Sequence, residues 1–115
     1  MNPIAAMEDG QIEPGSERGD LLGYSADVFA GWLWKRDGAV IISFIHVLQP
    51  GQGHFKAIVS RILESGCAVQ IPTPMGLMEL IVRKWGFTQA HVFDETYGEH
   101  VEVWTKQPPQ SVEQA

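Results

Sequence analysis

The clearest hydrophobic pattern begins at residues 27–35, where side chains alternate in the way typical of a β-strand. The alternation puts Val28, Ala30, Trp32 and Trp34 on one face and Phe29, Gly31 and Leu33 on the other. Asp37-Gly38 is the dipeptide that favours a tight hairpin turn. Residues 39–48 follow as a second strand, apolar on both faces, which is typical of a central strand covered from both sides.

After residues 49–53 the apolar period changes from about 2 to about 3.6 residues. Helical spacing relates Phe55, Ile58, Val59, Ile62 and Leu63, which predicts an amphipathic helix over residues 54–65. Gly66 stands where a helix commonly ends, and residues 67–71 are a short apolar strand. A strand, a helix and a second strand in this order form a βαβ unit, so we expect the two strands to be parallel.

A second helix is predicted to begin at Thr73-Pro74, with threonine as the N-cap and proline in the first turn. It ends at Gly86. Residues 88–94 and 100–105 alternate as strands, and residues 95–98 would join them as a hairpin. The predicted fold is α/β (α+β), with a mixed, mostly antiparallel sheet, one parallel βαβ unit and two main helices.

The ends of the chain lack this periodicity. Residues 1–23 contain four glycines, two prolines and five acidic residues against Arg18 alone. We expect a flexible acidic leader over 1–23 that adds little to a core, one domain over 24–106 and a flexible tail over 107–115. A solvated leader is the favoured interpretation, and an arm that docks on a basic protein partner is the alternative.

Charge and composition narrow the class of protein. The net charge of −6 disfavours nucleic-acid binding, which needs a basic face. The longest apolar run is far shorter than the ~18 residues of a membrane span, so no membrane partner is expected. The single Cys67 forbids an internal disulfide, and no secretory pattern is visible, so the expected location is cytoplasmic.

The most informative segment joins the second strand to the first helix. His46, Val47 and Leu48 lead into a turn, and Gly51, Gln52, Gly53, His54 and Phe55 follow. Glycines allow close approach of a ligand, and the first amides of a helix lack internal partners, so the junction is suited to a phosphate or a diphosphate. The alternative is a tight connection without a ligand.

The body of the chain resembles the second half of the GNAT superfamily of N-acetyltransferases. In that family a central strand enters an Arg/Gln-x-x-Gly-x-Gly/Ala loop that binds the diphosphate of acetyl-CoA. A helix, a splayed strand, a helix that ends in Gly-Phe and a closing hairpin follow. Here residues 50–55 match the loop, and Gly86-Phe87 matches the Gly-Phe pair. The resemblance implies that acetyl-CoA or another acyl-CoA binds at residues 46–48 and 51–55 and that a small-molecule or protein amine is the acceptor.

Four positions depart from the family pattern. Pro50 replaces the Arg or Gln of the loop, and Phe55 replaces its last small residue. Val82 replaces a tyrosine that protonates the leaving thiolate, and Met75 replaces an asparagine. The family's first strand and first two helices have no clear counterpart before residue 27.

No catalytic residue is assigned. His46 is a weak candidate for the base, since a neutral imidazole accepts protons near pH 7, and a buried structural histidine is the alternative. Tyr97, beside Asp94 in the hairpin that borders the acceptor in the family, is a weak candidate for the missing acid, and a packing tyrosine is the alternative. The histidines are scattered, so no metal site is predicted.

Two functions remain open. The first is a minimal GNAT-like N-acyltransferase. The second is a catalytically inactive protein of the same fold that serves in interaction or assembly, for example one encoded by a bacteriophage and located in its virion or directed at its host. The four tryptophans are expected in the core, with an aromatic binding surface as the alternative.

Overall fold

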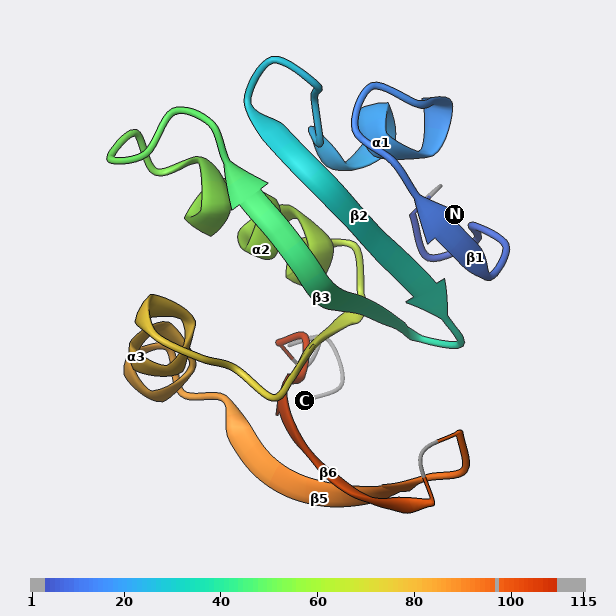
Figure 1. The fold of residues 1–115 in the computed structure, drawn as a ribbon. Coiled ribbons are helices and arrows are strands. Elements are labelled where there is room, and N and C mark those ends of the chain that lie inside the picture. The colour runs from blue at the N-terminus through green and yellow to red at the C-terminus, as the bar shows by residue number, and fades with distance from the viewer. Residues whose placement is uncertain (1–3, 97, 110–115) are drawn as a thin grey trace.

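The computed structural model describes residues 4–96 and 98–109, which form one mixed β-sheet with helices packed on it (Figure 1). Within these residues the fold is α+β, with six strands and three helices, as the pattern of apolar residues predicted for the class. The elements in chain order are β1 (Gly10–Ile12), α1 (Glu17–Leu22), β2 (Phe29–Arg36), β3 (Ala39–Val47), α2 (His54–Glu64), β4 (Ala68–Pro72), α3 (Leu77–Lys84), β5 (Thr88–Asp94) and β6 (Glu99–Lys106).

The sheet has the strand order β1-β2-β3-β4-β6-β5. Every neighbouring pair is antiparallel except β3 and β4, which are parallel and joined through α2. The predicted βαβ unit is therefore confirmed. The closing hairpin β5–β6 is also present, with β6 inserted next to β4.

The core lies between the sheet and the helices on one of its faces. The predicted stripe of α2 supplies Ile58, Val59 and Ile62, which are all buried, and α2 contacts β3 and β4. Each such side chain contributes about 1.5–3 kcal/mol when fully buried. α3 adds the fully buried Val82, and β6 adds Trp104, over which the Arg83 guanidinium lies 5.2 Å from the ring centroid.

Residues 4–23 contribute to this core, which differs from the predicted unpacked leader. Ile12 and Leu22 are 0% and 1% exposed, and Ile4 is buried beside them. Pro14 and Gly15 form the turn between β1 and α1, whereas Gly10 and Gly19 lie within these two elements, which are too brief to produce a period in the sequence. Of the predicted tail, residues 107–109 form no helix or strand, and 110–115 lie outside the described residues.

In the described part of the chain, no helix covers the other face of the sheet, which we call the open face. Trp32 and Trp34 are on this face, 40% and 39% exposed, and the Trp32 ring lies 5.1 Å from that of Phe44. The predictions that these tryptophans pack in the core and that both faces of β3 are covered are therefore wrong. Alternation shows which residues share a face, but it does not show which face the helices take.

The start of α3 also differs from the prediction. The N–H of Thr73 donates to the carbonyl of Glu102 on β6 (2.8 Å), and Thr73 has a φ of 42°. Thr73 lies just beyond the end of β4, and its left-handed φ differs from the extended conformation of an N-cap, so it does not cap a helix. α3 begins four residues later at Leu77, after Gly76. Among the described helices, none is both long and apolar enough to cross a membrane.

Candidate functional site

The parallel strands β3 and β4 are hydrogen-bonded neighbours over a short distance and then separate. Their register contains three pairs, Ala39 with Ala68, Val40 with Val69 and Ile41 with Gln70. Beyond Ile41, β3 continues to Val47 beside β2, and its end diverges from β4 (Figure 1). Over residues 42–47, β3 thus has no strand partner on the β4 side within the described residues. Backbone groups require hydrogen-bond partners, so this edge is suited to an extended ligand.

A glycine loop connects the diverging end of β3 to α2. The loop is anchored where it begins: the N–H of Leu48 donates to the carbonyl of Val28 (2.6 Å), and Gln49 Nε2 donates to the carbonyl of Asp27 (3.1 Å). Gly51 and Gly53 have φ values of +84° and +77°, which side chains disfavour. A Cβ atom at either position would meet nothing within 4 Å, so the space beside the loop is open.

The N-terminus of α2 lies directly after this loop. Gly53 occupies the N-cap position, and no side chain caps the helix there. The carbonyl of Gly53 accepts from the N–H of Ala57 (3.0 Å), which begins the helical ladder. The first amides of an α-helix have no acceptor within the helix, and its macrodipole adds about half a positive charge at this end. The junction therefore has the polarity that an anion site needs.

The histidine side chains do not converge on this junction. His46 pairs with Ala30 and is exposed on the open face, whereas Val47 turns to the opposite face and packs against the core. The alternative of His46 as a buried structural histidine is therefore wrong. The ring of His54 meets the edge of Phe29 (6.3 Å between centroids) and lines a cavity of about 450 Å³ beside α1. Only the backbone of His54 belongs to the helix terminus.

Phe55, the bulky residue of the loop motif, packs between the two larger helices. Its ring stacks on that of Trp85, which follows α3, with centroids 5.7 Å apart and planes inclined by 21°. Both side chains are half-buried against the core. Phe55 therefore adds to the packing of α2 against α3. Its ring lies more than 4 Å from the position that a Cβ atom would take at Gly51 or Gly53.

Two further positions of the family pattern have clear surroundings. Val82 is fully buried in the core, so a side chain at this position has no access to a bound ligand. Met75 is 77% exposed in the segment before α3. The first turns of α3 also carry Leu77 and Leu80, which are 73% and 63% exposed. α3 follows the end of β4 that diverges from β3.

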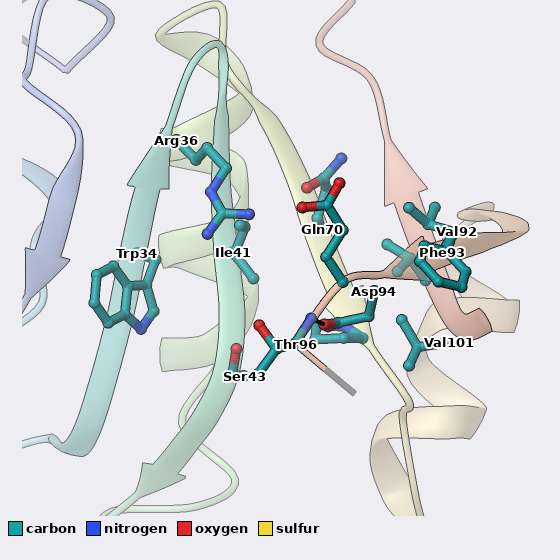
Figure 2. Close-up of a pocket in the computed structure, with 13 residues that line it drawn as sticks. Trp34, Arg36, Ile41, Ser43, Gln70, Val92, Phe93, Asp94, Thr96 and Val101 are labelled. Carbon is teal, nitrogen blue, oxygen red and sulfur yellow. Dashed lines mark hydrogen bonds between the residues drawn. The ribbon is translucent and has the colours of Figure 1, made fainter. Parts of the chain in front are cut away.

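A cavity of about 640 Å³ lies on the open face, between β2 and the end of the β5–β6 hairpin (Figure 2). Its floor is the sheet, and its lining mixes apolar with charged side chains. The lining residues are Trp34, Arg36, Ile41, Ser43, Gln70, Pro72, Val92, Phe93, Asp94, Glu95, Thr96, Val101 and Val103. Sequence reasoning considered only Trp34 and Asp94 among them. The signal that could have found Arg36 is the alternation that places it on the same face of β2 as Trp34.

The tip of the hairpin is held by Asp94. Its Oδ1 accepts the N–H of Thr96 (2.8 Å), and its carbonyl accepts the N–H of Gly98 (2.8 Å). Tyr97, the candidate acid, lies outside the described residues. Elsewhere on the hairpin, Glu102 accepts the indole N–H of Trp104, and His100 packs on the edge of Phe93.

Among the described residues, burial clearly shifts the pKa of one titratable group, Tyr24. Tyr24 is fully buried, its hydroxyl donates to the carbonyl of Ala30 (3.3 Å), and burial raises the pKa of Tyr24 to about 12. This hydroxyl belongs to the core and remains protonated near neutral pH. Among the described residues, no group of three His, Cys, Asp or Glu side chains is arranged to hold a metal ion.

No protein-family model, curated protein or solved structure matches the chain.

Proposed function

We propose that the chain binds an acyl-coenzyme A at the diverging ends of β3 and β4 and presents it to an amine acceptor. The observation that carries the proposal is the short parallel pairing of β3 with β4, which ends at Ile41 and Gln70. The strands separate toward the end at which the glycine loop and the N-terminus of α2 lie. A free strand edge and a positively polarised helix terminus thus occur together.

The order of elements supports a relation to the GNAT superfamily. As in the pattern that the sequence resembles, a central strand leads through a glycine loop into a helix, and a splayed parallel strand follows. The next helix is followed by Gly86-Phe87, and a hairpin closes the sheet. Parallel strands separated in this way are unusual in a small sheet, because each leaves backbone groups without a partner.

Each part of the ligand has a matching part of the chain. The N–H groups at the start of α2 would hold the diphosphate, and the open positions of Gly51 and Gly53 leave room for it. The unpaired edge of β3 over residues 42–47 would hold the pantetheine arm through main-chain hydrogen bonds. When bound, the coenzyme supplies an acyl thioester that is activated toward attack by an amine.

The acceptor would approach from the open face. The 640 Å³ cavity includes Ile41 and Gln70, the last pair before the strands diverge, so it adjoins the place where the thioester would lie. The buried Val82 offers no proton donor to the departing thiolate. In this proposal the proton reaches that thiolate from solvent or from the hairpin.

A thermal-shift titration with CoA tests the proposal. At a hundredfold excess over Kd, binding adds about 2.7 kcal/mol, which corresponds to a rise of about 10 °C in Tm for a domain of this size. Gly53→Asp should abolish the rise, because a carboxylate would stand against the diphosphate.

Gly66→Asp is the matched control. Gly66 has a φ of +92° and a Cβ there would also meet nothing within 4 Å, but it lies beyond the opposite end of α2. Both variants should be strained, and only Gly53→Asp should lose the response to CoA. The absence of any response in the wild-type chain at millimolar CoA would refute the proposal.

A second candidate function is an interaction or assembly module. It is favoured by the exposure of large apolar side chains on two surfaces, with Trp32 and Phe44 on the open face and Leu77 and Leu80 on α3. Such a module would not need CoA, so the same titration separates the two candidates.

A further inference from the structure

The cavity on the open face has opposite charges on its two sides. Arg36 extends over it from the end of β2, and Asp94 lies on the other side at the end of β5 (Figure 2). Glu95, the next residue along the chain, also lines the cavity. Arg36 and Glu95 are exposed, and across the described residues neither side chain forms an ion pair or a hydrogen bond. The guanidinium and the Glu95 carboxylate thus face one cavity without neutralising each other.

The surface between these charges combines apolar and polar side chains. Trp34 stands beside Arg36 and is 39% exposed, and Val92, on the same face of β5 as Asp94, is 51% exposed. Further apolar groups come from Ile41 of β3 and from Val101 and Val103 of β6, and polar groups come from Ser43, Gln70 and Thr96. An apolar side chain of a ligand readily displaces water from an indole ring that is exposed at a cavity.

Each charged group selects a different ligand group. A guanidinium binds a carboxylate with two parallel hydrogen bonds, and a carboxylate accepts hydrogen bonds from an ammonium. Because both groups are exposed, each contact alone is weak, and useful affinity requires a ligand that makes both contacts and also buries apolar surface. A carbohydrate would stack on the Trp34 ring but would leave the two charged groups without partners.

We propose that this cavity binds a zwitterionic amino acid or dipeptide with apolar side chains. Its carboxylate lies on Arg36, its α-ammonium lies toward Glu95 and Asp94, and its side chains contact Trp34 and Val92. The volume of about 640 Å³ is within the usual range of ligand cavities, about 300–1,000 Å³, and leaves room for two side chains. That this ligand is the acyl acceptor rests on the proposed function, whereas its binding does not.

The experiment is a calorimetric titration of the full chain with phenylalanyl-phenylalanine in the absence of CoA. Two analogues lack one charge each: the N-acetyl dipeptide has no ammonium, and the C-terminal amide has no carboxylate. We expect both analogues to bind at least about tenfold more weakly than the dipeptide, since each loses a charge-assisted hydrogen bond worth about 1.4 kcal/mol or more. A change in tryptophan fluorescence on binding should be smaller in Trp34→Phe than in the wild type if the ligand lies in this cavity.

Variants assign each charge to its contact. Arg36→Gln should weaken the dipeptide about tenfold but leave the amide unchanged, and Glu95→Gln should weaken the dipeptide and leave the N-acetyl form unchanged. Lys84→Gln, which removes an exposed charge from α3, is the control and should bind the dipeptide as the wild type does. Since all three side chains are exposed, circular dichroism should show unaltered folding.

Three outcomes overturn the inference: equal affinity for the dipeptide and both analogues, no binding at millimolar dipeptide, or unchanged binding after Arg36→Gln and Glu95→Gln. The outcome for the coenzyme is separate. A wild-type chain that binds the dipeptide but does not respond to CoA would refute only the proposed function. A chain that responds to CoA but does not bind the dipeptide would refute only this inference.

Discussion

The rings of Phe55 and Trp85 stack at a centroid distance of 5.7 Å. They join the first turn of α2 to the residue directly after α3. This contact explains how a bulky residue fits where the family pattern has a small one. The ring is taken into the packing between helices, and the loop backbone at Gly51 and Gly53 stays open.

Phe55→Ala should therefore lower stability without improving access to the loop. Loss of a half-buried aromatic stack is expected to reduce the free energy of unfolding by about 2 kcal/mol. Urea unfolding followed by tryptophan fluorescence measures this loss, and Leu80→Ala on the exposed side of α3 is the control. If Phe55→Ala bound CoA and the wild type did not, the Phe55 ring would obstruct the loop instead of packing away from it.

Two adjacent leucines test whether the N-terminal segment is part of the core. Leu22 is 1% exposed and Leu21 is 36% exposed at the end of α1. Leu22→Ala should cost about 3 kcal/mol, and Leu21→Ala should cost no more than about 0.5 kcal/mol. Chemical denaturation of both variants gives the two values directly. Equal, small effects would mean that residues 4–23 do not pack on the sheet in solution.

Stability should fall at high pH because Tyr24 is buried. Its pKa is raised to about 12 from an ordinary value near 10, so the folded state holds the phenolic proton more tightly than the unfolded state. This contribution to the free energy of unfolding is complete below pH 10 and is lost as the pH rises through about 12. At that pH the loss amounts to about 2 kcal/mol. Tyr24→Phe should remove this part of the pH dependence. A wild-type profile between pH 10 and 12 that matched the variant would contradict the assignment.

The position of Val82 predicts how the chain responds to the family tyrosine. Val82→Tyr inserts a phenol into a fully buried site, so overpacking should cost about 1–3 kcal/mol. Leu80→Tyr, on the exposed side of the same helix, should be tolerated. Differential scanning calorimetry compares the two. A stable Val82→Tyr variant with a normally titrating phenol would show that this position is open to solvent.

Much of the fold was predictable because its signals are local. The stripe from Phe55 to Leu63 specifies α2, and the change of period around Gly51 and Gly53 specifies the βαβ unit and hence the parallel pair. The loop residues were found because glycines at a strand-to-helix junction have a direct structural meaning.

The rest depends on contacts between distant residues. Which face of the sheet the helices cover is decided by packing, so the alternation of β2 alone does not show that Trp32 and Trp34 are exposed. Thr73 has the side chain of an N-cap, but it adopts a left-handed φ of 42°, and α3 begins only after Gly76. The cavity joins Arg36 to Glu95 across the sheet, and nothing in either segment signals the other.

Amide NMR of the labelled chain during a titration with CoA locates the bound coenzyme residue by residue. We expect the largest shifts at Gly51, Gly53 and the first residues of α2, together with residues 42–47 along the edge of β3. Shifts confined to the cavity beside Arg36, or no shifts at millimolar CoA, would contradict binding of CoA at the diverging strands.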